Sequence, residues 1–354
     1  MVGIDFPTTA AALGARIGAQ IVGDPNREVR CLRALEFARE GSLSFLADPK
    51  YADRLPHAEG AVVVTNARLA RPQDHLTLLI VEDPKSSFAS VAQTLRAPAS
   101  QNGISPLASI GAGCEIDPTV SIGPYACIGD GVRIGPRTRL GPLVVLGNGV
   151  QIGSDCDLHP QVVLYERIQL GNRITIHAGT IIGGDGFGYF RAGGNGPYVQ
   201  MPHLGTVIIE DDVRLGSNST VDRGTLSDTR IGQGTKTDDQ AHIGHNVRIG
   251  KDNIICAQTA LGGSAVLADD VMLGGQSAIG PGCTVGQGAR MGGQSGTTIN
   301  VPANDTYMFN PPIPIKDFTR IYRGMRNLPE LFKRVRRIEA QIGARPEEGD
   351  TKDG

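Results

Sequence analysis

The sequence predicts a mainly β protein built on a parallel β-helix, and three features of its 354 residues support this fold class. An aliphatic residue recurs at every sixth position from Ile104 to Ile182. The period resumes at Ile209 and, after an irregular turn that follows Val221, continues to Met291. Glycine is abundant, with 48 residues, as expected for a chain that turns often. A six-residue period fits neither an α-helix nor simple strand alternation, but it is a signature of the parallel β-helix.

Three hexapeptides make one triangular coil, in which the aliphatic side chain points into the prism and a turn follows it. The residue four positions later also points inward, and in the first run it is small or β-branched: Cys114, Val120, Ala126, Val132, Thr138, Val144, Val150, Cys156, Val162, Ile168, Ile174 and Thr180. At the ~4.8 Å spacing of neighbouring strands, about ten coils form a rod of roughly 45 Å. Stacked repeats of this kind are stable only in numbers.

Composition and charge narrow the class of protein. The formal net charge is −2, so no overall electrostatic field favours nucleic acid as a partner. The six cysteines form no CxxC pair, and Cys114, Cys156 and Cys283 fall on inward positions, where a thiol acts as a small apolar filler. No basic start with an apolar run is present, and no apolar stretch approaches the ~18 residues of a membrane span. We therefore expect a cytoplasmic protein without a transmembrane segment.

Residues 1–101 lack the six-residue period, and we expect them to form a small α/β domain. Thr8 or Thr9 is a suitable N-cap for a first helix, and two apolar runs are typical of buried strands. The expected elements are a helix at Thr8–Ile17, strands at Val62–Val64 and Leu78–Val81, and a helix at Ser86–Leu95.

The segment from Phe45 to Tyr51 stands out in this domain, because the chain has only nine Phe, seven Tyr and no Trp. Phe45 and Tyr51 flank a turn at Asp48-Pro49, and two rings so placed can hold a flat ring between them by stacking. The alternative is that Phe45 belongs to the core and Tyr51 to the surface. The residues alone favour this alternative.

We expect the β-helix to occupy residues 102–300, with an inserted loop at 183–207. The loop opens with a glycine-rich run: Asp185, Gly186, Phe187, Gly188 and Tyr189. Long loops in compact folds are usually functional, and glycine-rich loops that precede a helix can bind phosphate. No helix follows directly and no P-loop Lys-Ser/Thr is present, so we interpret the loop as a lid or a groove wall.

Polar residues of the second run indicate a catalytic corner. His245 lies two positions past inward Ile243 and so faces out of the prism, while Asp238 lies on the previous corner. An outward histidine near a carboxylate suits general-base catalysis, because its pKa lies near neutrality. One coil further on, Gly263 leaves a backbone N–H about one strand spacing from the imidazole, where it suits an oxyanion. A solvated turn histidine is the alternative, which the residues alone favour.

Histidine pairs also suggest a metal site as an alternative. His177 follows His159 by one full coil of the repeat, so the two rings are expected to stack, and His242 lies close to His245. Clustered histidines can bind zinc. Because no cysteine or carboxylate ligand stands at a known spacing, we expect solvated rings and no metal.

Residues 301–354 are expected to form a C-terminal helical extension and, after Ala344, a disordered tail. Helical sequence begins near Lys316 and carries one apolar stripe: Leu328, Leu331, Phe332, Val335, Ile338 and Ile342. Eight Lys and Arg residues against Asp317 and Glu330 give 8 − 2 = +6 over residues 316–337. Such charge indicates either a solvated face or a docking surface for an acidic partner.

Over nearly its whole length the chain resembles the UDP-3-O-(3-hydroxyacyl)glucosamine N-acyltransferases of lipid A biosynthesis. The resemblance rests on the order and spacing of four motifs: Phe45-Leu46-Ala47-Asp48-Pro49-Lys50-Tyr51, Asp185-Gly186-Phe187-Gly188-Tyr189, Asp222-Arg223-Gly224 and Ile243-Gly244-His245-Asn246-Val247. It implies a left-handed β-helix, an exception to the right-handed crossover rule. It also implies a homotrimer with active sites in the clefts between subunits.

The same resemblance implies direct transfer of a 3-hydroxyacyl chain to the 2-amine of UDP-3-O-(3-hydroxyacyl)glucosamine, without a serine or cysteine nucleophile. His245 matches the family's general base, Asp238 the carboxylate that orients it, and Gly263 the oxyanion N–H. Uracil would bind at three residues of the N-terminal domain: Phe45, Asp48 and Tyr51. The donor would be acyl carrier protein, which carries the acyl chain on phosphopantetheine, and no cofactor would be bound. The basic C-terminal helices would dock the carrier protein.

Two residues depart from the family pattern. Asp48 stands where asparagine is usual, and a carboxylate can accept a hydrogen bond from uracil but cannot donate one. Gly282 stands where a second histidine is usual.

The main alternative is a CoA- or carrier-dependent acyltransferase that acts on another nucleotide-linked amino sugar. Four other β-helix proteins are less consistent with the sequence. The sister O-acyltransferase lacks this N-terminal domain, and a sugar N-acetyltransferase needs no basic docking helix. A β-helix of the carbonic anhydrase type needs zinc, and an ice-binding rod needs regular Thr ladders.

Overall fold

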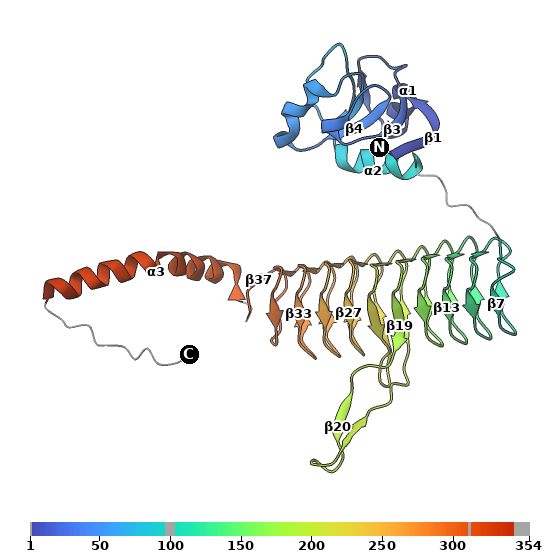
Figure 1. Ribbon diagram of the computed structural model, residues 1–354, viewed down its shortest axis with the longest axis vertical. Coiled ribbons are helices and arrows are strands. Elements are labelled where there is room, and N and C mark those ends of the chain that lie inside the picture. Colours follow the sequence, from blue (N-terminus) through green and yellow to red (C-terminus); the bar gives the residue numbers. More distant parts are fainter. Residues whose placement is uncertain (1, 96–102, 311–312, 343–354) are drawn as a thin grey trace. The chain divides into compact units, whose positions relative to one another are not determined.

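The computed structural model describes residues 2–95, 103–310 and 313–342, and it divides the chain into two compact units. The first unit is Met1–Ser100 and the second is Gln101–Gly354 (Figure 1). The first is a small α/β domain. The second is a parallel β-helix with an inserted hairpin and a C-terminal helix, so the predicted fold class is confirmed.

The N-terminal unit contains a six-stranded mixed sheet in the order β1-β3-β4-β5-β6-β2. Its strands are β1 (Val2–Thr9), β2 (Gln20–Val22), β3 (Glu28–Leu32), β4 (Ser42–Leu46), β5 (Val62–Thr65) and β6 (Thr77–Ile80). Its helices are α1 (Ala10–Ile17) and α2 (Pro84–Leu95), with 3-10 turns at Leu35–Phe37 and Pro49–His57. Strands β3 to β6 run parallel, and β1 and β2 pair antiparallel at the two edges.

All four elements predicted for this unit are present. Thr9 is the N-cap of α1, since its hydroxyl accepts a hydrogen bond from the Ala12 N–H at 3.3 Å. Strand β5 is buried on both faces, because Val62 packs in one apolar cluster and Val63 in the other. A strand with two buried faces reads as a continuous apolar run, which is why the sequence revealed it.

The second unit is a prism of three parallel sheets. The first sheet contains β7 (Ser109–Ile110), β10 (Cys127–Ile128), β13 (Val145–Leu146), β16 (Val163–Leu164), β19 (Ile181–Gly184), β24 (Thr220–Asp222), β27 (His242–Ile243), β30 (Ala260–Leu261), β33 (Ala278–Ile279) and β36 (Gly296–Thr297). The second contains β8 (Glu115–Ile116), β11 (Arg133–Ile134), β14 (Gln151–Ile152), β17 (Gln169–Leu170), β22 (Val207–Ile209), β25 (Thr229–Ile231), β28 (Arg248–Ile249), β31 (Val266–Leu267) and β34 (Thr284–Val285). The third contains β9 (Ser121–Ile122), β12 (Arg139–Leu140), β15 (Asp157–Leu158), β18 (Thr175–Ile176), β23 (Arg214–Leu215), β26 (Lys236–Thr237), β29 (Ile254–Ile255), β32 (Met272–Leu273), β35 (Arg290–Met291), β37 (Thr306–Met308) and β38 (Ile313–Pro314).

The aliphatic residues of the six-residue period fill the prism, as predicted. Ile128, Leu146 and Leu164 are register partners in consecutive coils of the first sheet, and all three are buried. Cys156 and Cys283 are buried in the same core. The exceptions lie in the first coil, where Ile104 and Ile110 remain exposed. A coil at the end of the rod lacks the neighbour that would cover it.

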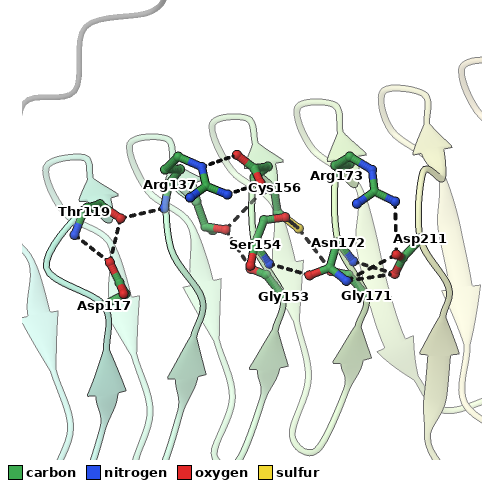
Figure 2. A network of polar contacts seen from close by, with 12 residues as sticks. Asp117, Thr119, Arg137, Gly153, Ser154, Cys156, Gly171, Asn172, Arg173 and Asp211 are labelled. Atoms are coloured by element: carbon green, nitrogen blue, oxygen red, sulfur yellow. Dashed lines mark hydrogen bonds and ion pairs between the residues drawn. The ribbon is translucent and has the colours of Figure 1, made fainter.

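Polar side chains link successive coils along one corner of the prism (Figure 2). The Asn172 Oδ1 accepts a hydrogen bond from the Ser154 N–H at 2.9 Å, and the Asn172 N–H donates in turn to Asp211 Oδ1 at 2.8 Å. Arg137 donates two hydrogen bonds of 2.6 Å to Asp155 in the next coil. These side chains satisfy backbone groups at corners where the sheet ladder is interrupted.

The inserted loop at 183–207 leaves the rod after β19 and contains a short antiparallel hairpin that the sequence did not predict. Figure 1 shows this hairpin, β20 (Tyr189–Arg191) with β21 (Tyr198–Gln200), projecting from the rod. Gly193 and Gly194 adopt φ of 59° and 83° at its turn, a region that favours glycine. The Arg191 guanidinium lies 4.5 Å from the centre of the Tyr198 ring and braces the two strands.

The C-terminal end of the rod differs from the expectation in two respects. The parallel ladder continues beyond residue 300, because β37 pairs with β35 through Met291 and Tyr307. A single helix, α3 (Ile315–Ile342), follows in place of several helices, and none of its residues is buried. The predicted disordered tail lies outside the described residues. None of the helices in the described part of the chain combines the length and hydropathy that crossing a bilayer requires.

Candidate active site

A hollow of about 860 Å³ lies on the outer side of the first sheet, and we call it the catalytic hollow. Its floor is formed by the outward residues Ala260, Ala278 and Gly296, which are register partners in three consecutive coils. Small side chains at these positions leave a groove along the rod. The remaining lining residues are Phe187, Asp222, His242, Gly244, His245, Leu261, Gly262, Gly263, Ser264, Ile279, Gly280, Pro281, Gly282, Thr297, Thr298 and Asn310.

His245 follows β27 on the corner that overlooks this hollow, and its proton position is fixed by Asn246. The Nδ1 atom of His245 lies 3.0 Å from Asn246 Oδ1. The amide of Asn246 is itself oriented, because Oδ1 accepts from the Thr225 N–H at 3.0 Å and Nδ2 donates to Ser227 Oγ at 2.9 Å. An amide oxygen only accepts, so Nδ1 of His245 carries the proton. Its Nε2 therefore presents a lone pair.

Gly263 lies directly against the imidazole, as the predicted coil register requires. A Cβ atom built on Gly263 would be 2.5 Å from His245 Nε2, so only glycine fits while the ring keeps this position. The neighbouring amides are engaged, since Gly262 N–H donates to Ile279 O and Ser264 N–H donates to His245 O. Within residues 103–310, the Gly263 N–H has no hydrogen-bond partner. A free N–H on a residue that packs against an imidazole suits the stabilisation of an oxyanion.

The inserted loop forms a wall of the catalytic hollow through its glycine-rich run. A Cβ on Gly186 would be 2.7 Å from His245 Cβ, and Phe187 lines the hollow with an exposed ring. Gly188 lies against His203, and Tyr189 packs on Phe187 with ring centres 5.0 Å apart. The glycine-rich run therefore brings its backbone close to His245.

Arg223 anchors the start of this loop. Its Nε donates to Gly183 O at 2.6 Å, its N–H donates to Gly184 O at 2.9 Å, and its guanidinium forms an ion pair with Glu166 Oε1. Arg223 is buried. Burial acts to raise the pKa of Glu166, yet the hydrogen bond from Arg223 brings that pKa below its usual value.

His203, from the end of the loop, was not singled out from the sequence. It is 4% exposed, and its ring lies edge-on to that of His245 with centres 5.0 Å apart. Both of its ring nitrogens are buried without a hydrogen-bond partner among the described residues. Because it belongs to an irregular insertion, no repeat register pointed to it.

The carboxylate in the catalytic hollow is Asp222, not Asp238. Asp238 follows β26 in the third sheet, is exposed, and is absent from the lining of the hollow. The structure therefore gives no contact within one chain through which Asp238 could orient His245. Asp222 Oδ2 instead lies 3.7 Å from His242 Nε2, and its side chain is 15% exposed. Burial raises the pKa of Asp222, although the charge of a protonated His242 acts in the opposite direction.

His159 and His177 lie one coil apart with ring centres 4.5 Å apart, as the register predicted, but the rings are tilted by 50° rather than stacked. Burial lowers the pKa of His177. Across the described residues, no group of three or more His, Cys, Asp or Glu side chains could hold a metal ion.

A second hollow, of about 590 Å³, lies in the N-terminal unit and brings Phe45, Asp48 and Tyr51 together; we call it the N-terminal hollow. The Tyr51 ring is flanked by Lys50 Nζ and by the Arg54 guanidinium, each 4.7 Å from its centre. Arg54 and Lys50 also line the hollow. One pocket thus combines aromatic rings with positive charge.

Within the N-terminal hollow, Phe45 and Asp48 each have a structural partner. Phe45 is half-buried and packs on Phe88, with ring centres 4.7 Å apart. Asp48 accepts a hydrogen bond from the Lys50 N–H at 3.0 Å at the start of the 3-10 turn, and this bond lowers its pKa. An ionised Asp48 presents acceptors only.

Comparisons with known proteins agree with this description. Residues 26–94 match the family model described as UDP-3-O-(3-hydroxymyristoyl) glucosamine N-acyltransferase, LpxD, and residues 228–263 match that of the bacterial transferase hexapeptide. A UDP-3-O-acylglucosamine N-acyltransferase of Coxiella burnetii is 39% identical over 245 residues, which are 69% of this chain and 71% of that protein. The enzyme of the same description from Pseudomonas paraeruginosa is 44% identical over 253 residues, 70% of each chain. The crystal structure of the UDP-N-acetylglucosamine O-acyltransferase of Moraxella catarrhalis matches with a TM-score of 0.46 and 25% identity, over 60% of this chain and 73% of that chain.

Proposed function

This chain belongs to the family of UDP-3-O-acylglucosamine N-acyltransferases, and from that premise we propose how its residues carry out the transfer. The acyl donor is a 3-hydroxyacyl thioester on the phosphopantetheine of acyl carrier protein. The acceptor is the 2-amine of UDP-3-O-(3-hydroxyacyl)glucosamine, and the product is its 2,3-diacyl derivative. Transfer is direct, from thioester to amine.

His245 acts as the general base. Asn246 holds the proton on Nδ1, so Nε2 is free to accept a proton from the attacking amine. Gly263 packs against this ring, and its N–H then donates a hydrogen bond to the oxyanion of the tetrahedral intermediate. The single observation that carries the proposal is this pairing of a bare imidazole nitrogen with an uncommitted N–H at the edge of one hollow. A general base typically raises the rate by about 10²–10⁴-fold, and an oxyanion donor by about 10²–10³-fold.

Uracil binds in the N-terminal hollow. Phe45 and Tyr51 offer ring faces for stacking, and the ionised Asp48 accepts a hydrogen bond from uracil N3–H. Lys50, Arg54 and Lys85 supply positive charge for a diphosphate. Glu36 and Asp48 also line the hollow, so three cations against two carboxylates leave an excess of one positive charge for the diphosphate.

The basic helix α3 docks the carrier protein, and the enzyme works as a homotrimer. Residues 316–337 carry a net charge of +6 and remain unburied, which suits an acidic partner. The catalytic hollow is an open groove on one face of the rod, and a neighbouring subunit would close it. Its small-residue floor, Ala260, Ala278 and Gly296, suits an acyl chain.

A transfer assay tests the proposal. Purified protein is mixed with UDP-3-O-(3-hydroxyacyl)glucosamine and with 3-hydroxyacyl carrier proteins of several chain lengths, and the amide product is followed by mass. Acetyl-CoA and the matching acyl-CoA are the control donors. Amide formation that depends on the carrier protein is expected. Transfer from acetyl-CoA alone, or an active His245→Ala variant, would contradict the assignment.

A further inference from the structure

Asp222 and His242 form a second acid–base pair in the catalytic hollow, for which the mechanism above has no role. Asp222 Oδ2 lies 3.7 Å from His242 Nε2, and Thr220 Oγ1 lies 2.8 Å from His242 Nδ1. The backbone fixes this arrangement, because Thr220 and His242 are register partners on β24 and β27. Both Asp222 and His242 line the hollow that His245 overlooks.

The two histidines of the hollow have opposite hydrogen-bond environments. On His245, the partner of Nδ1 is an amide oxygen, so Nε2 is left as a lone pair. On His242, Nε2 faces a carboxylate, which favours a proton on that nitrogen. One ring therefore offers a lone pair to the hollow, and the other lies beside a carboxylate that can hold a proton on it.

The chemistry of amide formation requires both roles. As the C–N bond forms, the amine nitrogen must lose a proton, and as the C–S bond breaks, the sulfur leaves as a thiolate that must gain one. His245 takes the proton from nitrogen. We propose that His242, held by Asp222, is the general acid that protonates the departing thiolate. The two protons balance, and solvent carries one from His245 back to His242 before the next turnover.

The surroundings of Asp222 support this role. Four ionisable groups act on its carboxyl: His242, His245, His203 and Asp185. Burial raises the pKa of Asp222, so the pair with His242 retains a shared proton more readily than an exposed pair would. The His242 side chain is 48% exposed and lines the hollow, so a thioester sulfur bound there can reach it.

The test compares two donors that carry the same 3-hydroxyacyl group on thiols of different acidity. One is the phosphopantetheine thioester of acyl carrier protein, whose alkanethiol is a poor leaving group. The other is an aryl thioester, whose thiolate leaves without protonation. His242→Gln should lower kcat/KM about 10²-fold with the carrier-protein donor, the usual contribution of a general acid. With the aryl thioester the loss should fall below about tenfold, because no proton is needed.

Two further variants make the test specific. Asp222→Asn should follow His242→Gln, with a large loss on the alkyl donor and a small one on the aryl donor. His245→Gln should lose the same factor with both donors, because its proton comes from the amine. Thermal melts of all three variants establish that they are folded, and the uncatalysed reaction of the aryl thioester is subtracted.

The outcomes separate this inference from the proposed function on which it rests. If the wild-type protein transfers from neither donor, the proposed function fails. If the wild-type protein transfers from both donors, and His242→Gln loses the same factor with each, the general-acid role is refuted and His242 serves in substrate binding or packing. A donor-dependent loss supports the role of His242 as the acid.

Discussion

The imidazole of His245 and the backbone of Gly263 are in contact, and no side chain fits between them. A methyl carbon at position 263 would lie 2.5 Å from Nε2 and 2.7 Å from Cε1. We expect Gly263→Ala to keep its N–H but to displace the ring, and so to lower kcat by about 10²–10⁴-fold, the range for a lost general base. Steady-state kinetics and a thermal melt test this together.

Gly275→Ala is the matched control for that variant. Gly275 also follows a Leu-Gly pair in the rod, but it is not part of the catalytic hollow. A Cβ there would meet only Ala257 O, at the ordinary distance of 3.4 Å. Its kcat should stay within about twofold of the wild type, as for surface changes that touch nothing. Equal losses in the two variants would mean that Gly263 matters for the rod rather than for catalysis.

His245→Ala is expected to reduce turnover by about 10²–10⁴-fold, because the amine then has no positioned base. The ring is half-buried and lies outside the core of the prism, so the rod should stay folded. Circular dichroism and size-exclusion chromatography check the fold and assembly. Turnover close to that of the wild type would remove His245 from the mechanism.

Asn246 accepts a hydrogen bond from His245 Nδ1–H, and two substitutions at this position test whether that bond contributes to catalysis. Asn246→Leu removes the acceptor for Nδ1–H and should lower kcat about tenfold or more, as loss of a hydrogen bond to a reacting group does. Asn246→Asp keeps an acceptor but adds a negative charge beside the ring. The hydrogen bond to Nδ1 is then retained, so kcat should fall by less than it does in Asn246→Leu. Equal losses in the two variants would argue that this hydrogen bond does not position His245.

The Glu166–Arg223 ion pair predicts a stability change on the acid side. The pKa of folded Glu166 is depressed, so its contribution is present above the unfolded value of about 4.3 and is lost as the pH falls through the folded value. Glu166→Gln should lower Tm at pH 7 and speed amide exchange in residues 183–207. The difference in Tm from the wild type should shrink below about pH 4. A difference that does not depend on pH would indicate a packing effect.

Tyr51→Ala should raise KM for the UDP-sugar and leave kcat nearly unchanged, because stacking on uracil acts equally in ground and transition states. Stacking of a base on an aromatic ring is worth about 1–3 kcal/mol, so KM should rise roughly 10–100-fold. Asp48→Asn is the informative companion. It keeps the oxygen that accepts from Lys50 N–H and adds a donor for a uracil carbonyl, so KM should not rise. Unchanged KM in Tyr51→Ala would place uracil elsewhere.

The sequence predicted the rod, the N-terminal elements and the approach of Gly263 to His245, all of which depend on fixed spacing. The six-residue period sets which residues face inward, and one regular coil of three hexapeptides places Gly263 against His245 without any further information. The same logic placed His177 on His159. Where a local period fixes the geometry, the sequence is sufficient.

The rest of the site could not be predicted, because it depends on coils of irregular length. Val221 pairs with Ile243, so the coil between them is longer than three hexapeptides, and Thr220 and Asp222 come to lie beside His242. The register places Asp238 on the corner before His245, and in the structure it follows β26 of a different sheet. The hairpin and His203 arise from an insertion with no period. The C-terminal extension was predicted to be helical without a count of helices, and it forms one continuous helix that contains Pro329.

The inserted loop has a consequence for how this enzyme can vary. Leu170 and Ile209 are register partners although the whole inserted hairpin lies between them in sequence, so the surplus residues leave the ladder intact. The next coil, from Ile209 to Ile231, is also longer than three hexapeptides, and its two ends still pair in register. In both coils the extra residues leave the rod at corners beside the catalytic hollow. Substrate selectivity can therefore be altered by changing the length of these corners, while the stack of coils keeps its register and its stability.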